Sequence, residues 1–99
     1  MTPVDILELQ RLRELHALEA LECLGAYVKF DRDFTPMGAS STRRVHVNIG
    51  GRDLELLIDG PKFYDTRAKK GGGGAIDLVM YLWGVRFKEA FAMLQEAKP

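Results

Sequence analysis

One stretch of the chain joins basic side chains to consecutive glycines, residue types that together suit the binding of a phosphate group. Residues 62–74 hold four bases followed by four glycines. The bases are Lys62, Arg67, Lys69 and Lys70. Glycines let backbone N–H groups approach a ligand closely, and a helix beginning after them would add partial positive charge. The stretch therefore predicts an anion-binding loop, with a solvated surface loop as the alternative.

The same stretch does not predict a nucleotide P-loop. A P-loop places Lys and then Ser or Thr directly after its final glycine. Here Ala75-Ile76-Asp77 follows the glycines, and the lysines precede them.

Three further arginines lie next to the region that predicts β-strands, at Arg43, Arg44 and Arg52. They could extend a basic surface towards Lys69 and Lys70, or they could be solvated charges with no ligand.

Two consecutive aromatic residues, Phe63 and Tyr64, offer a second kind of contact. Side chains of successive strand residues point to opposite faces, so one ring is expected in the core and the other can be exposed. Tyr64 is the candidate for stacking on a nucleic-acid base, with Phe63 as the alternative.

Residues for metal binding are sparse. His16, His46 and Cys23 are the only soft ligands, and none has a paired spacing such as Cys-x-x-Cys. Cys23 lies in an apolar helical stripe, which predicts a buried packing residue rather than a reactive thiolate. We expect no metal and no cofactor.

A catalytic pair of acids is also not indicated. Asp65 and Asp77 are the candidates, but Asp77 falls in the first turn of a predicted helix, where the helix dipole favours an acid. The sequence therefore predicts no catalytic residue and no enzyme activity in this chain.

The composition predicts one domain over residues 1–99. Hydrophobic residues make up 46% of the chain, and the formal net charge is zero. A single cysteine excludes an internal disulfide, and the N-terminus lacks a secretory signal pattern, so we expect a cytoplasmic protein. No apolar stretch approaches the roughly 18 residues that span a membrane.

The elements that position these residues can be read along the chain. Residues 1–25 predict helices, starting at Thr2, Pro3 and Asp5. Leucines recur every third residue, a spacing that drifts about 60° per step around a helix, so one straight helix cannot bury them all. We expect a break near residues 14–17 and a C-terminal cap at Gly25. The leucines are Leu9, Leu12, Leu15, Leu18, Leu21 and Leu24.

Residues 26–66 predict antiparallel strands. Residues 26–30 form the first, and residues 45–49 alternate with the valines inward and His46 and Asn48 outward. Turns at residues 50–51 and 59–61 lead to strands at 54–58 and 62–65.

Residues 71–97 predict the glycine loop followed by two helices, 75–83 and 87–97, with Gly84 ending the first. Trp83, Phe87 and Phe91 are expected between these helices and the sheet. The predicted fold class is α+β, with a small antiparallel sheet of three to four strands covered on one face by the N-terminal and C-terminal helices.

At the C-terminus, Gly-Gly-x-Ala-Ile-Asp-Leu-Val-Met (residues 72–80) and the segment from Trp83 to Leu94 resemble the zinc-ribbon domain of bacterial, phage and plasmid DNA primases. Similar domains precede Toprim-like modules in plasmid and mobile-element proteins. The resemblance extends over roughly residues 24–96. In the primase pattern the two ligand pairs would fall on residues 35–38 and on Thr66 and Lys69, which carry no zinc ligand here. The resemblance thus implies the fold without the metal.

The resemblance also implies a function. It predicts a non-catalytic module that binds single-stranded DNA in the replication or transfer of a plasmid or mobile element. The binding residues would be Arg43, Arg44, Arg52, Lys62, Tyr64, Arg67, Lys69 and Lys70. One alternative is a module that docks on a primase, helicase or relaxase without touching DNA. A homodimer formed through the leucine-rich N-terminal helices is another.

Overall fold

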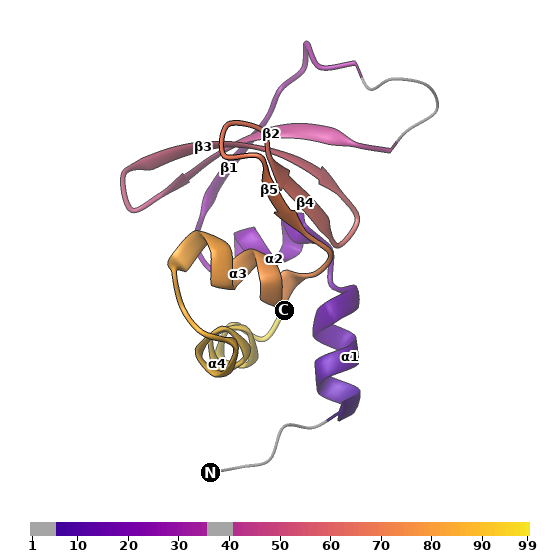
Figure 1. Cartoon of the computed structure of the whole chain (residues 1–99), viewed down its shortest axis with the longest axis vertical. Coiled ribbons are helices and arrows are strands. Elements are labelled where there is room, and N and C mark those ends of the chain that lie inside the picture. Colours follow the sequence, from indigo (N-terminus) through magenta and orange to yellow (C-terminus); the bar gives the residue numbers. More distant parts are fainter. Residues whose placement is uncertain (1–5, 36–40) are drawn as a thin grey trace.

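The computed structural model describes residues 6–35 and 41–99. Within them, four helices surround one face of a five-stranded sheet in which every strand runs antiparallel to its neighbour (Figure 1). The strand order is β1-β2-β3-β4-β5, so the sheet is a simple meander. The predicted α+β class is confirmed, with one strand more than the three to four expected.

The N-terminal leucines are shared between two helices, α1 (Ile6–Glu14) and α2 (Ala17–Cys23). His16 between them has an extended backbone, with φ −64° and ψ 141°. This change of direction lets Leu12 on α1 and Leu21 on α2 both be fully buried. The predicted break is confirmed, whereas the predicted helix start at residues 2–5 lies outside the described residues.

The end of α2 has the predicted glycine cap. Gly25 has a positive φ of 81°, a conformation that costs glycine little because it has no Cβ. Its N–H donates to the carbonyl of Glu22 at 3.1 Å, and the N–H of Ala26 donates to the carbonyl of Leu21 at 3.0 Å. These two bonds form a Schellman motif, which turns the chain into the first strand.

Four of the strands lie where the sequence predicts them. They are β1 (Tyr27–Phe30), β2 (Arg43–Ile49), β3 (Arg52–Asp59) and β4 (Lys62–Asp65). The hairpin between β2 and β3 turns at Gly50 and Gly51, both at positive φ, as a type I′ turn requires. Gly60, with φ 56°, precedes Pro61 in the hairpin between β3 and β4.

The fifth strand, β5 (Lys70–Gly72), corrects the prediction of a glycine loop over residues 71–74. Gly71 pairs with Tyr64, and Gly72 pairs with Phe63. A Cβ on Gly71 would lie 2.5 Å from the carbonyl oxygen of Phe63, so a larger residue does not fit there without movement. Gly71 and Gly72 therefore allow β5 to pair closely with β4.

The helices cover one face of the sheet. Figure 1 shows α2 and α3 (Ala75–Trp83) against this inner face. As predicted, the valines of β2 point inward: Val45 is 0% exposed and Val47 is 1% exposed. The buried core also includes Leu56, Ile58, Phe63, Ile76, Leu78, Val79 and Leu82.

The last helix, α4 (Phe87–Ala97), lies on the far side of α3 from the sheet (Figure 1). Phe91 is buried, and its ring stacks on Phe87 with centroids 6.3 Å apart. Trp83 and Phe87 are half-buried. Phe87 and Phe91, which are on α4, therefore extend the core one layer further from the sheet than the sequence predicts.

Candidate functional site

The face of the sheet opposite α2 and α3 is the natural place to look for a binding surface. On this outer face Arg44 on β2 lies opposite Leu57 on β3, and Leu57 lies opposite Tyr64 on β4. Gly71 on β5 completes the row. Basic, apolar and aromatic groups therefore adjoin one another across four strands.

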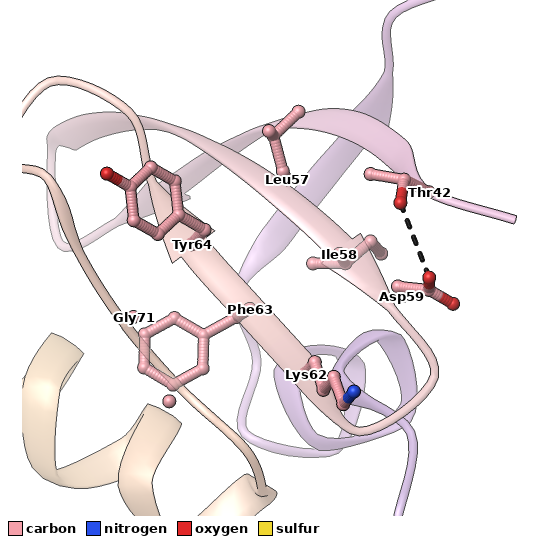
Figure 2. A pocket seen from close by; sticks show the side chains of 9 residues that line it. Thr42, Leu57, Ile58, Asp59, Lys62, Phe63, Tyr64 and Gly71 are labelled. Carbon is pink, nitrogen blue, oxygen red and sulfur yellow. Dashed lines mark hydrogen bonds between the residues drawn. The ribbon is translucent and has the colours of Figure 1, made fainter. Parts of the chain in front are cut away.

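A shallow hollow of about 400 Å³ lies at one end of this row (Figure 2). Leu57, Tyr64 and Gly71 line it together with Thr42 and Lys62.

The two neighbouring aromatic residues of β4 have the opposed orientations that the sequence predicts. Figure 2 shows the ring of Phe63 turned towards the helices and away from that of Tyr64. Phe63 is 5% exposed, whereas Tyr64 is 42% exposed. Tyr64 is therefore the aromatic residue that can stack on a ligand.

Arg44 is engaged by its neighbours. Its Nη2 atom lies 2.7 Å from Oδ2 of Asp31, and its guanidinium lies 5.2 Å from the ring centroid of Phe34. Nη1 of Arg44 lies 4.0 Å from Oε1 of Glu55. Nε2 of His46 lies 3.5 Å from the same Oδ2 atom of Asp31. The hydrogen bond from Arg44 holds the pKa of Asp31 below its ordinary value. Much of the charge of Arg44 is therefore matched locally.

Arg43 and Arg52 do not join the outer row. Arg43 pairs with the inward-facing Ile58 and borders a hollow beside His16, at the start of α2. Nη2 of Arg52 donates to the carbonyl of Leu82 at 2.8 Å, which satisfies a free carbonyl near the end of α3. The single basic face predicted from Arg43, Arg44 and Arg52 is therefore divided between the two sides of the sheet.

The remaining bases gather at the turn that joins β4 to β5. Arg67, Lys69 and Lys70 are exposed there, and residues 66–70 contain no acid. Lys69 closes the turn in the left-handed region, with φ 56°. We call residues 66–70 the basic turn.

Asp65 holds the basic turn in place. Its Oδ1 atom accepts hydrogen bonds from the backbone N–H groups of Arg67 and Ala68, at 3.1 and 3.2 Å. Its Oδ2 atom accepts a hydrogen bond from the hydroxyl of Tyr81 on α3, at 2.7 Å. The carboxylate is 4% exposed. The turn is therefore fixed both to its own strand and to a helix.

These hydrogen bonds shift the ionisation of both partners. Burial raises the pKa of Asp65, but the hydrogen bonds from Tyr81, Ala68 and Arg67 outweigh burial and hold that pKa below its ordinary value. The hydrogen bond to Asp65 raises the pKa of Tyr81. Asp65 is thus a charged acceptor at neutral pH.

The sequence considered Asp65 only as a possible catalytic acid and missed this anchoring role. A signal was present, because Asp65 has the same strand parity as the buried Phe63 and must face inward. An acid at an inward position requires a partner. The partner, Tyr81, is 16 residues away on another element.

The resemblance to the primase zinc-ribbon domain implies ligand positions at residues 35–38, Thr66 and Lys69, and none of these residues is a histidine or a cysteine. Thr66 and Lys69 occupy the basic turn, while part of the segment 35–38 lies outside the described residues. Across residues 6–35 and 41–99, no three His, Cys, Asp or Glu side chains come close enough to hold a metal ion.

The residue before the first turn of α3 has little room for a side chain. Gly74 is the N-cap residue, and a Cβ there would lie 3.1 Å from the carbonyl oxygen of Arg13. Asp77 occupies the first turn, where its negative charge already complements the helix dipole. Gly74 therefore packs closely against α1, while a hollow of about 270 Å³ lined by Arg13, Gly73 and Asp77 adjoins the helix start, so the anion-binding loop stays a prediction.

Cys23 is exposed, so the prediction that it packs in the core is wrong. Leu21 and Leu24 turn towards the core on the last turn of α2, whereas Cys23 points away from them. Successive residues of a helix are rotated by about 100°, so the side chain of Cys23 points in a different direction from that of the neighbouring Leu24.

No helix within the described residues has the length and apolar character needed to cross a lipid bilayer.

Comparison with known proteins gives one partial similarity. A segment of 43 residues is 51% identical to part of a protein of Zymomonas mobilis subsp. mobilis named "65 kDa protein". The segment makes up 43% of this chain and 7% of that protein. No protein-family profile matches the chain. No solved structure is significantly similar to it.

Proposed function

We propose that this chain is a non-catalytic DNA-binding module whose basic turn contacts the phosphate backbone. The observation that carries the proposal is the arrangement of Arg67, Lys69 and Lys70 on a turn anchored by Asp65. An anchored turn presents its charges at fixed positions, so less conformational entropy is lost when they meet phosphates.

Zero net charge does not oppose this proposal. The field at a phosphate is set by charges within about 10 Å at moderate salt, because more distant exposed charges are screened. The basic turn carries three positive charges, and the buried carboxylate of Asp65, which lies opposite Lys70 in the strand pairing and accepts hydrogen bonds from the turn, offsets one of them. On the outer face, by contrast, Arg44 is paired with Asp31. The turn is therefore the stronger attractor for a polyanion.

Single-stranded DNA suits the surface better than duplex DNA. Tyr64 lies on β4, the strand that leads into the basic turn, and its ring is exposed on the outer face. Exposed rings beside basic groups are the usual means of binding unpaired bases, which offer their flat faces for stacking. The resemblance of residues 72–94 to the primase zinc-ribbon domain supports the same proposal, and from it we propose a role in the replication or transfer of a plasmid or mobile element.

The test is fluorescence anisotropy with labelled single-stranded and double-stranded oligonucleotides of equal length. The variant R67A/K69A/K70A should lose at least tenfold in affinity, since each contact between a basic side chain and a phosphate adds to binding. A control variant with the same net charge, R32Q/R86Q/K98Q, removes three exposed basic side chains outside the turn. It should bind as tightly as the wild-type protein. Equal losses in both variants would refute a specific role for the turn.

A second candidate function is docking on another protein, such as a primase, helicase or relaxase. The observation that favours it is the exposure of two large apolar residues at the start of α1, Ile6 at 70% and Leu7 at 76%. The same surface would serve a homodimer. I6E/L7E should abolish a partner complex or a dimer in sedimentation and co-purification, while leaving DNA binding unchanged.

A further inference from the structure

The hollow on the outer face has an aromatic wall at one end and an acidic edge at the other. Tyr64 lies opposite Leu57, and the next outward pair along the same two strands is Lys62 opposite Asp59. Successive outward residues of a strand are separated by roughly 6.7 Å. Figure 2 shows Tyr64 and Asp59 at different ends of the hollow. Tyr64 and Asp59 are diagonal neighbours on these two strands, so their Cα atoms are roughly 7–8 Å apart, a gap that a flat ring of nucleobase size can bridge.

We propose that this hollow binds one nucleobase of the DNA strand and prefers bases that carry an exocyclic amino group over thymine. The inference rests on the proposed DNA-binding function and extends it, because the basic turn alone carries no preference for any base.

The ring of Tyr64 is set for stacking. Gly71 lies beneath it on β5, and a Cβ at that position would come within 3.0 Å of the Tyr64 Cδ2 atom. The ring therefore rests directly against the backbone of β5, which limits its movement. Stacking on such a ring is worth about 1–3 kcal/mol per base and does not distinguish one base from another.

The preference for amino-bearing nucleobases over thymine comes from Asp59. A carboxylate only accepts hydrogen bonds, and it has about four acceptor positions. Two are used by hydroxyl groups: Ser41 donates to Oδ1, and Thr42 donates to Oδ2 at 3.3 Å. Acceptor capacity remains for an amino group of adenine, cytosine or guanine. Thymine has no exocyclic amino group, and its one ring donor, N3–H, lies between the O2 and O4 acceptors, which repel a carboxylate that approaches it.

Lys62 supplies the charge that a nucleotide also needs. It lines the hollow beside Asp59 and is exposed. From Lys62 to the start of the basic turn, β4 spans ~13 Å at about 3.3 Å per residue. A single strand running along β4 would therefore meet Lys62 at one end and the basic turn at the other, with its base over Tyr64 between them.

The preference can be measured with oligo(dC), oligo(dA) and oligo(dT) of one length in competition assays against a labelled mixed-sequence strand. The wild-type protein should bind oligo(dC) and oligo(dA) about tenfold more tightly than oligo(dT), the factor that one hydrogen bond to a charged group supplies. D59N should bring the three affinities together, because an amide both donates and accepts. Y64L should weaken all three equally.

The outcomes separate the two proposals. Salt-dependent binding without any preference for amino-bearing bases would overturn the nucleobase site and leave the DNA-binding function standing. No binding of any oligonucleotide would overturn both. Because D59N also alters the contacts to Ser41 and Thr42, its fold is checked by circular dichroism. Titration of wild-type protein with dCMP and dTMP, followed by NMR shifts of the Thr42 and Gly71 amides, tests the same preference without a variant.

Discussion

The hydroxyl of Tyr81, in the last turn of α3, donates a 2.7 Å hydrogen bond to the carboxylate of Asp65, the last residue of β4. The same carboxylate accepts the N–H groups of Arg67 and Ala68. One buried acid thus connects a helix, a strand and a turn. We infer that this acid orders the basic turn.

Removing Asp65 should loosen the basic turn and destabilise the fold. D65A leaves the Tyr81 hydroxyl and two backbone N–H groups without their acceptor, which should lower the free energy of unfolding by roughly 2–3 kcal/mol. Urea denaturation measures this loss. Asp33 is an exposed acid, so D33A is the matched control and should change stability by less than about 0.5 kcal/mol. Equal stabilities of D65A and D33A would contradict the anchoring role.

Stability should also depend on pH at both ends of the range. Asp65 has a lowered pKa, so its contribution is present at neutral pH and is lost as the pH falls below about 4. Tyr81 has a raised pKa, so its contribution holds at neutral pH and is lost as the pH rises above about 10.

The variant Y81F tests both limbs of this pH dependence together. It removes the hydroxyl that links the two groups, so both limbs should become shallower in urea unfolding measured from pH 3 to 11. An acid limb should persist in Y81F because Asp31 also has a lowered pKa. A profile identical to that of the wild-type protein would show that the hydrogen bond has no energetic role.

The glycine run offers a matched pair of substitutions. A Cβ on Gly72 would lie 2.8 Å from Cβ of Asp77 and 2.8 Å from Cε1 of Phe63, whereas a Cβ on Gly73 meets nothing within 4 Å. G72A should therefore cost about 1–3 kcal/mol through overpacking. G73A should be neutral or stabilising by a few tenths. Thermal unfolding of both variants decides the matter, and equal midpoints would show that β5 is not packed as described.

Arg52 should matter for stability and not for DNA. Its guanidinium donates to the carbonyl of Leu82 near the end of α3, on the helix-covered side of the sheet. R52A should lower the free energy of unfolding by about 0.5–1.5 kcal/mol, the usual worth of one such bond. Its affinity for single-stranded DNA should equal that of the wild-type protein. A tenfold loss of affinity in a folded R52A would place Arg52 in the binding surface after all.

Local chemistry explains why much of the fold could be predicted from sequence. Gly25, Gly50, Gly51 and Gly84 each supply a positive φ that ends a helix or turns a hairpin, so the element boundaries near them are encoded by neighbouring residues. The threefold spacing of leucines likewise requires a helix break, whatever the tertiary structure. These signals do not depend on distant partners.

The parts that could not be predicted depend on tertiary contacts. Strand β5 has the sequence Lys-Gly-Gly, which has no hydrophobic alternation and low β propensity, and it forms because β4 pairs with it. Pairing of Arg44 with Asp31 joins residues from two different strand ends. Arg52 reaches a helix 30 residues later in the chain. The division of Arg43, Arg44 and Arg52 between the two sides of the sheet therefore required the structure.

The most direct test of the central claim is the salt dependence of binding to a single-stranded oligonucleotide, measured for the wild-type protein and for R67A/K69A/K70A. Each phosphate contact on a single strand contributes a slope of about −0.7 to log K against log salt. Loss of three contacts should therefore reduce the slope by roughly 2 in magnitude. Equal slopes for the two proteins would contradict a DNA-binding role for the basic turn.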